Sequence, residues 1–298
     1  MKYFSFWLCY ILCKLTFANG QMLCIPHHAG EKDWSSNSLY AINKAQLAGF
    51  KTINITLELS KDGVPFAYHG FSLLNQTNVT ANPESATISE LKALDAAYNF
   101  SKGTNFPLRG QGITISSLDE ILTYQQANNL HLILDLKSHD NVGLVKAVIT
   151  SINKSKSANK LWADTVFYST DSNSLAIMKK LEPKANLFID RQTTFKLLLS
   201  GVIDQETSHK LRESNWIGFE LYREVQICEQ FTLGKNCSNI TREMWNKQLI
   251  HRLKAINPDL KVVMFAINSP AMYQSAHMLG ADAVYVDSPL EICPLNKS

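Results

Sequence analysis

Short apolar runs alternate with longer amphipathic patterns along most of the chain. The runs are rich in Val, Ile and Phe and have the length of strands buried in a parallel sheet. They predict strands at Met22–Pro26, Thr52–Leu59, Val64–Tyr68, His131–Leu136, Thr165–Tyr168, Asn186–Ile189, Trp216–Glu220, Lys261–Ala266 and Ala283–Val286. Apolar residues every three or four positions predict helices at Ser38–Ala48, Ser117–Ala127, Val142–Ile152, Asn173–Leu181, Arg242–Ile256 and Pro270–Leu279.

This alternation predicts a parallel α/β fold of the (β/α)8 barrel type, the TIM barrel. The run at Val64–Tyr68 follows a tight turn at Lys61–Gly63 and returns beside the strand before it. The other eight runs are the predicted strands of the barrel. A doubly wound open sheet is the alternative, and it is disfavoured because neither G-x-G-x-x-G nor G-x-x-x-x-G-K follows any strand. No linker rich in Pro, Gly or Ser divides the chain, so we expect one barrel domain over residues 21–298.

The first twenty residues have the pattern of a secretory signal peptide. A basic start at Lys2 precedes an apolar stretch over residues 3–13, and Ala18 and Gly20 place small residues before a cleavage site. We expect residues 1–20 to be removed and the protein to be secreted or periplasmic. An uncleaved anchor is the alternative, but the stretch is short for a bilayer and is interrupted by Lys14.

Composition and charge exclude several classes of protein. With 45% hydrophobic and 18% charged residues, the chain can bury a full core, which excludes a disordered or collagen-like protein. The formal net charge is +3, and removal of Lys2 and Lys14 with the signal brings it close to zero. We therefore expect neither a nucleic-acid partner nor a polybasic membrane anchor.

Polar residues gather where the predicted strands end, which is where a barrel carries its chemistry. The first strand ends in His27 and His28, and the returning run ends in His69. Asp135 and Lys137 share one face of a strand because side chains alternate. Two imidazoles beside a carboxylate and a lysine suit phosphodiester cleavage, one accepting a proton from the attacking hydroxyl and the other protonating the leaving oxygen.

Several motifs, in order along the chain, resemble those of the glycerophosphodiester phosphodiesterase family, which belongs to the PLC-like phosphodiesterase superfamily. They are Ile25–Gly30, Asn37–Leu39, Leu59–Val64, Tyr68–His69, Thr87–Asp95, Ser117–Leu122, Leu134–Lys137 and Leu279–Pro289. The resemblance implies a TIM barrel that cleaves a glycerophosphodiester into an alcohol and a glycerol phosphate, often with Ca²⁺ or Mg²⁺. It places the catalytic histidines at His28 and His69 and matches Lys137, while Asp135 replaces a metal-binding Glu.

The family's paired metal carboxylates, spaced E-x-D, fall here on Asn54 and Thr56. Three interpretations follow. In the first, a rearranged metal site uses Asp135, Glu58 and Asn54. In the second, the histidines act without tight metal binding, helped by Lys137, through attack by a neighbouring substrate hydroxyl. In the third, the protein is a pseudoenzyme that binds a phosphate-containing ligand.

Substrate contacts are predicted at Glu220, Phe265 and Asn268, the last two by resemblance to the family's aromatic wall. A segment over residues 71–109, inserted after the second histidine, is either a lid that contacts lipid transiently or an ordinary surface loop. The sphingomyelinase D phospholipases resemble the segments around His69 and Asp135, which makes lysophospholipids a second substrate class.

Four cysteines follow the signal, an even number that favours disulfides in an exported protein. Four cysteines allow three pairings, and free buried thiols are the alternative. In a closed barrel the first and last strands are neighbours, which favours Cys24–Cys293 and leaves Cys228–Cys237 to bridge one loop.

Overall fold

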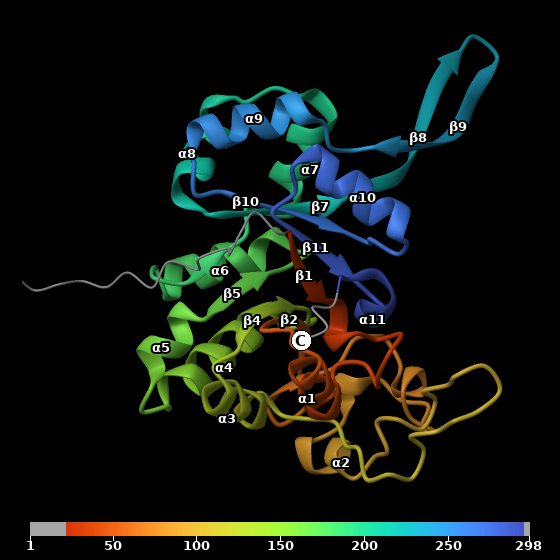
Figure 1. Ribbon diagram of the computed structural model, residues 1–298, viewed down its shortest axis with the longest axis vertical. Helices are drawn as coiled ribbons and strands as arrows, with labels where there is room; N and C mark the ends of the chain where they lie inside the picture. Colours follow the sequence, from red (N-terminus) through yellow and green to blue (C-terminus); the bar gives the residue numbers. More distant parts are fainter. Residues whose placement is uncertain (1–21, 295–298) are drawn as a thin grey trace, which may run out of the picture.

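The computed structural model describes residues 22–294, so the predicted signal peptide lies outside the described residues. Within this range eight parallel strands form the barrel (Figure 1). In chain order they are β1 (Leu23–Pro26), β2 (Thr52–Leu59), β4 (His131–Leu136), β5 (Thr165–Tyr168), β6 (Asn186–Leu187), β7 (Trp216–Glu220), β10 (Lys261–Phe265) and β11 (Ala283–Val286). The fold is the predicted (β/α)8 barrel.

Two ladders make up the barrel wall, in the orders β2-β4-β5-β6 and β7-β10-β11-β1. A parallel bridge between Phe188 and Trp216 joins them on one side. On the other side, between β1 and β2, the described residues form no ladder, and side-chain amides span the seam instead. Asn54 Oδ1 accepts from the His28 backbone N–H at 3.3 Å, and Asn37 Oδ1 accepts from the Thr56 N–H at 2.9 Å.

Side chains alternate between the two faces of the barrel wall. The outward face packs against the helices through Ile53, Ile55, Leu57, Leu132, Leu134, Leu136, Phe167, Ile217, Phe219, Val262, Met264, Val284 and Val286. The inward face fills the barrel through Ile25, Ile133, Val166, Tyr168, Phe188, Trp216, Val263, Phe265, Ala283 and Tyr285. Asn54, Thr56 and Asp135 have the inward parity on their strands, so they point into the barrel.

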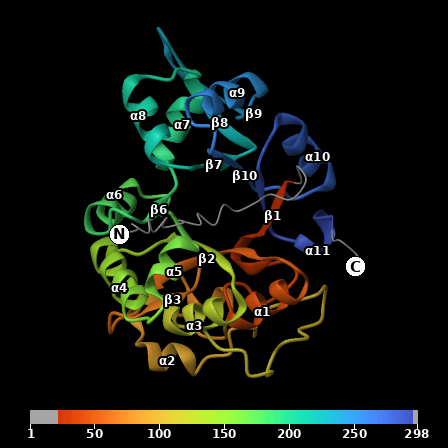
Figure 2. The ribbon, with the colours of Figure 1, turned by 60° about the vertical axis from the view of Figure 1, so that its left-hand side comes forward.

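Helices surround the barrel (Figure 2). They are α1 (Leu39–Leu47), α2 (Ile88–Lys92), α3 (Leu118–Asn128), α4 (Asn141–Asn153), α5 (Ala158–Ala163), α6 (Ser172–Leu181), α7 (Arg191–Ser200), α8 (Gln205–Glu213), α9 (Lys247–Ile256), α10 (Pro270–Leu279) and α11 (Pro289–Ile292). Many begin after a side chain that accepts a hydrogen bond from the first turn, among them Ser38, Asp140, Asp171, Asp190, Asp204, Asn246 and Ser269.

Three predictions of secondary structure need correction. The strand predicted at Asn186–Ile189 ends at Leu187, as β6. The returning run is shorter than predicted, β3 (Pro65–Ala67), and pairs antiparallel with β2 outside the barrel order. The helix predicted at Arg242–Ile256 begins only at Lys247, because Arg242 lies in a hairpin of β8 (Tyr222–Phe231) and β9 (Gly234–Glu243). This hairpin extends away from the barrel in Figures 1 and 2, and both of its faces are largely exposed.

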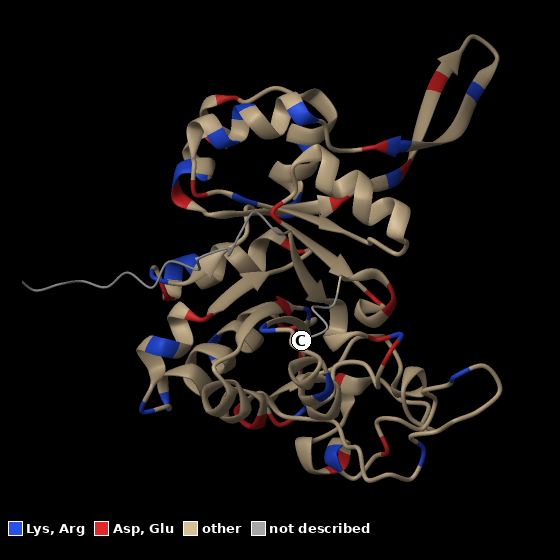
Figure 3. Cartoon of the chain, in the orientation of Figure 1, with Lys and Arg blue, Asp and Glu red and all other residues tan. Residues whose placement is uncertain are grey.

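The predicted disulfides Cys24–Cys293 and Cys228–Cys237 are both present. The first links β1 to the residue that follows α11, and the second joins directly paired residues of the hairpin. Basic and acidic side chains are interspersed on the hairpin and on the helices (Figure 3). Across residues 22–294, every helix is too short or too polar to cross a bilayer.

The inserted segment after His69 folds over an apolar cluster of its own. It contains the short helices η3 (Leu73–Asn75), η4 (Pro83–Ser85) and α2, and Leu73 is buried while Phe100 packs against the same cluster. Phe71, in contrast, is 90% exposed, and Leu74 and Phe106 are also exposed. Much of this segment is therefore packed around its own apolar cluster. A few of its apolar side chains stay exposed at the surface.

Candidate active site

A strained turn brings two adjacent histidine rings to the same place. His28 and Ala29 have φ angles of 49° and 62°, a left-handed conformation that is costly for residues other than glycine. Backbone hydrogen bonds hold the turn, from Gly30 N–H to His27 O at 2.7 Å and from Asn37 N–H to His28 O at 2.9 Å. On a regular strand the two rings would point to opposite faces, whereas here they stack with centroids 3.7 Å apart.

His28 is buried in the site and is only 2% exposed. Its Nδ1 is 2.7 Å from Glu31 Oε2, and its ring centroid is 4.5 Å from that of His69. Burial lowers the pKa of His28 well below its usual value, and His27, His69 and Lys137 add to this effect. A neutral imidazole that donates from Nδ1 to Glu31 keeps a free lone pair on Nε2. His28 is therefore set to accept a proton at Nε2.

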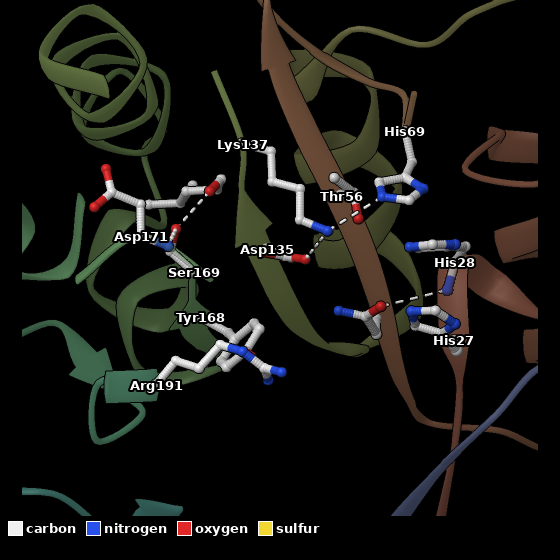
Figure 4. A network of polar contacts seen from close by, with 12 residues as sticks. His27, His28, Thr56, His69, Asp135, Lys137, Tyr168, Ser169, Asp171 and Arg191 are labelled. Carbon is white, nitrogen blue, oxygen red and sulfur yellow. Dashed lines mark hydrogen bonds and ion pairs between the residues drawn. The ribbon is translucent and has the colours of Figure 1, made fainter. Parts of the chain in front are cut away.

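Lys137 connects the second histidine to the buried carboxylate of β4 (Figure 4). Its Nζ lies 3.1 Å from Asp135 Oδ2 and 3.2 Å from His69 Nε2. Although His69 is exposed in part, its partial burial and then the Lys137 ammonium lower its pKa to about 4. Burial raises the pKa of Asp135, and Lys137 partly offsets this.

The inward face of β2 presents Asn54, Thr56 and Glu58. Asn54 is engaged on both sides of its amide, because Oδ1 accepts from His28 N–H and Nδ2 donates to Ile133 O at 3.1 Å. Glu58 Oε1 accepts from the Gly70 N–H at 3.1 Å, and burial raises the pKa of Glu58 to about 8. The neutral and anchored amide of Asn54 is a poor ligand for a hard cation.

A different group of side chains has the spacing of metal ligands. One donor atom each from His27, His28 and Glu31 lie within 4.8 Å of one another. His27 Nδ1 is also 2.9 Å from Asp287 Oδ1. Two imidazoles with a carboxylate suit Zn²⁺ and other transition ions rather than Ca²⁺ or Mg²⁺. The sequence prediction did not include Glu31 or Asp287, since only the strained turn brings them to the histidines.

The opposite wall of the site carries an ion pair. Arg191 donates to Glu220 Oε1 at 2.6 Å and to the Tyr168 hydroxyl at 3.1 Å. Figure 4 shows Arg191 and Tyr168 on the other side of β2 and β4 from His27 and His28 in this view. The prediction of Glu220 as a mouth residue fits this position, whereas Arg191 and Tyr168 carry no signal in the sequence.

The predicted aromatic wall is only partly at the centre of the site. Phe265 stacks on Tyr285 with centroids 4.5 Å apart and is nearly buried in the barrel. Asn268 is exposed at the rim, where its side chain hydrogen-bonds to Asp287 and helps to lower the pKa of that carboxyl. Phe265 therefore supports the site from below, and Asn268 lies near its edge.

Buried polar atoms on five strands belong to this part of the barrel. These atoms have no hydrogen-bond partner among the described residues, and we call them the open polar atoms: His28 Nε2, Thr56 Oγ1, Asp135 Oδ1, Glu220 Oε2 and the Tyr285 hydroxyl. Each lies on, or directly after, a strand whose carboxyl end reaches the mouth of the barrel. A buried polar group without a partner costs about 1–3 kcal/mol. Such a concentration in one place indicates a binding site for a polar ligand.

Comparisons with known proteins agree with this geometry. The model of the glycerophosphoryl diester phosphodiesterase family matches residues 27–291. An uncharacterized protein, Rv2277c, of Mycobacterium tuberculosis is 30% identical over 273 residues, which cover 90% of this chain and 87% of that protein. The crystal structure of its glycerophosphoryl diester phosphodiesterase domain superposes with a TM-score of 0.77 at 28% identity, covering 91% of this chain and 97% of that one.

A second solved structure is similar in fold. It is an Oleispira antarctica phosphodiesterase in complex with the product sn-glycerol-3-phosphate, with a TM-score of 0.67 and 21% identity. The match covers 90% of this chain and 93% of that chain. At this identity the similarity shows the shared barrel.

Proposed function

Since the chain belongs to the glycerophosphoryl diester phosphodiesterase family and is a phosphoric diester hydrolase, we propose that it is an exported enzyme that hydrolyses glycerophosphodiesters. Lysophospholipid head groups are a second substrate class. His28 acts as general base and His69 as general acid. One observation carries the proposal: the centroids of the two rings lie 4.5 Å apart in the part of the barrel that contains the open polar atoms.

The chemistry follows from the positions of the side chains. His28 Nε2 removes the proton from a water, or from a neighbouring hydroxyl of the substrate, as that oxygen attacks phosphorus. Glu31 orients the ring and stabilises the imidazolium that forms. Lys137, which donates to His69 Nε2 in the free enzyme, turns to a phosphoryl oxygen and frees that nitrogen to carry a proton. His69 then protonates the departing alcohol oxygen, and the bond from phosphorus to that oxygen breaks.

The substrate class is supported by a relative of the same fold. The Oleispira antarctica structure contains sn-glycerol-3-phosphate as the product, and we propose the same product here. If a substrate hydroxyl attacks instead of water, the product is a cyclic phosphate.

Members of this family commonly use a divalent cation. The sequence predicts Ca²⁺ or Mg²⁺ held by Asp135, Glu58 and Asn54. These residues do not fit a hard cation, because Asn54 is neutral, both sides of its amide are engaged, and Asp135 is already paired with Lys137. No step of the proposed mechanism is routed through such an ion.

A binding protein without catalysis is the second candidate. The replacement of two metal carboxylates by Asn54 and Thr56 favours it, while the intact pair of histidines favours catalysis. Purified protein, incubated with glycerophosphocholine and analysed for free choline and sn-glycerol-3-phosphate, distinguishes the two. Turnover that disappears in His69→Ala supports the enzyme. Binding of sn-glycerol-3-phosphate without turnover, whether Ca²⁺, Mg²⁺ or Mn²⁺ is added, supports the binding protein.

We further propose that the protein is exported and touches membranes transiently. Exposed Phe71, Leu74 and Phe106 lie in the segment that follows His69, near the mouth of the barrel. Amino-terminal sequencing of secreted protein should begin at Gln21, and a chain that retains Met1 contradicts cleavage. Phe71→Ser should weaken flotation with phosphatidylcholine vesicles, and equal flotation of both proteins contradicts a contact at this residue.

A further inference from the structure

The positions at which the family holds its metal ion have lost the chemistry that a hard cation requires. Ca²⁺ and Mg²⁺ bind through several oxygen ligands, with carboxylates supplying the charge. Of the three positions, Asn54 and Thr56 are neutral, and only Asp135 carries a carboxylate. Thr56 offers a single hydroxyl oxygen, which is one of the open polar atoms.

Asn54 cannot turn towards an ion without a structural cost. Its amide accepts a hydrogen bond of 3.3 Å from the His28 N–H, in the turn after β1. It also donates one of 3.1 Å to Ile133 O on β4. The bond from His28 helps to hold the seam between β1 and β2, where the described residues form no ladder. Rotation of the amide would therefore disturb the turn that positions His28.

The remaining carboxylate, Asp135, already forms an ion pair with a lysine. Lys137 Nζ lies 3.1 Å from Asp135 Oδ2, and Asp135 is buried. A divalent ion bound to Asp135 would lie within about 2.0–2.6 Å of a carboxylate oxygen, and so close to the ammonium group that the two positive charges would repel each other. Arg191, which Figure 4 shows below Asp135, adds a second positive charge that acts on Asp135.

We infer that this enzyme neutralises the phosphoryl group of its substrate with the ammonium of Lys137, held in place by Asp135, and requires neither Ca²⁺ nor Mg²⁺. The inference rests on the proposed function for its catalytic meaning. Lys137 is placed for this role because it lies between the carboxylate that fixes it and the histidine that protonates the leaving group. Asp135 is a positioning residue, which acts through Lys137.

The first test measures catalysis on metal-free protein. After treatment with EDTA, kcat/KM for glycerophosphocholine should stay within about twofold of the untreated value, with no gain on adding Ca²⁺ or Mg²⁺. Lys137→Met should lower kcat/KM by roughly 100-fold or more, and Lys137→Arg should restore part of it. Lys146→Met, on the exposed surface of α4, is the matched control. Loss of activity in EDTA that Ca²⁺ or Mg²⁺ restores overturns the inference.

The second test does not depend on activity. Excess Ca²⁺ or Mg²⁺ should leave the melting temperature of the wild-type protein unchanged, because an ion that does not bind the folded state does not stabilise it. A rise in the melting temperature that Asp135→Asn abolishes overturns the inference. The Asn54→Glu/Thr56→Asp variant, or Thr56→Asp alone if the double variant does not fold, serves as the positive control and should gain stability with the ions.

A third measurement separates the inference from the proposed function. In EDTA, sn-glycerol-3-phosphate should bind the wild-type protein, and Lys137→Met should weaken this binding at least tenfold, or about 1.4 kcal/mol. If the protein cleaves nothing, the proposed function fails, while this binding and the melting temperatures still decide the role of Lys137. Equal binding to wild type and Lys137→Met overturns the inference.

Discussion

The two histidines proposed as general base and general acid, His28 and His69, have environments that favour their neutral forms. Burial lowers the pKa of both, to about 4 for His69, and the nearby Lys137 lowers both further. A general acid must carry its proton, and above its pKa the protonated fraction falls with rising pH. In the free enzyme, the protonated fraction of His69 is therefore larger at acidic pH than at neutral pH.

This predicts an acidic pH optimum. Between pH 5 and pH 7, kcat/KM should fall by about tenfold per pH unit, because His69 loses its proton as the pH rises away from 4. In Lys137→Met the remaining activity should fall at a higher pH, since the ammonium no longer lowers the pKa of His69. A pH profile of kcat/KM for both proteins measures this, and a wild-type profile that is flat across this range contradicts it.

Glu58 predicts a pH dependence of stability. Its pKa in the folded protein is about 8, above the ordinary value of 4.5, so folding favours the protonated form. The free energy of unfolding should therefore fall as pH rises from the ordinary value to 8, by up to about 1.4 kcal/mol per pH unit. Glu58→Gln cannot titrate, so its advantage over wild type should grow between pH 5 and pH 8. Urea denaturation at pH 5 and pH 8 measures the free energy of unfolding of both proteins, with Glu224→Gln on the hairpin as control. The same difference between Glu58→Gln and wild type at the two pH values would contradict the prediction.

At the scale of elements, strands buried on both faces were predictable and exposed ones were not. The bounds of β2, β4, β5, β7 and β11 agree with the apolar runs, because helices cover one face and the barrel interior covers the other. The β8–β9 hairpin was missed because neither face packs on the core, so no alternation marks it. The stacking of His27 on His28 could not be predicted either, since it depends on left-handed φ angles that the residue types do not favour.

The two disulfides should differ in their effect on stability. Cys24–Cys293 ties the first strand to the end of the chain across a sequence separation of 269, so the double Ser variant should lose roughly 2–4 kcal/mol of unfolding free energy. Cys228–Cys237 closes only the exposed hairpin, so its double Ser variant should lose less than about 1 kcal/mol of global stability. Urea denaturation of both variants measures this, and equal losses contradict it.

At the scale of the whole molecule, the barrel gathers chemistry from strands that are far apart in the sequence. The motifs around His28, His69 and Asp135 could be found in the sequence, and the fold brings these residues together in one site. Arg191, Tyr168 and Tyr285 could not be found in this way, because only the barrel sets Arg191 and Tyr168 across from the histidines and stacks Tyr285 near His27. The open polar atoms exist for the same reason, and they make the free site less stable than an apolar one.

Tyr285→Phe tests this cost. The substitution removes one open polar atom, so the ligand-free protein should gain about 1 kcal/mol of unfolding free energy. The same substitution should lower kcat/KM, because the hydroxyl is then missing from the site. Urea denaturation and steady-state kinetics measure the two effects, and a variant that is less stable at full activity contradicts the assignment.

The central claim is that two imidazoles act together on one phosphodiester. The most direct measurement is kcat/KM for glycerophosphocholine in His28→Ala, His69→Ala and the double variant. Phosphorus NMR monitors the hydrolysis. We predict a loss of roughly 10³-fold in each single variant and little further loss in the double variant, because residues that act as a unit are not additive. Near wild-type activity in either single variant, or losses that multiply in the double variant, would contradict the account.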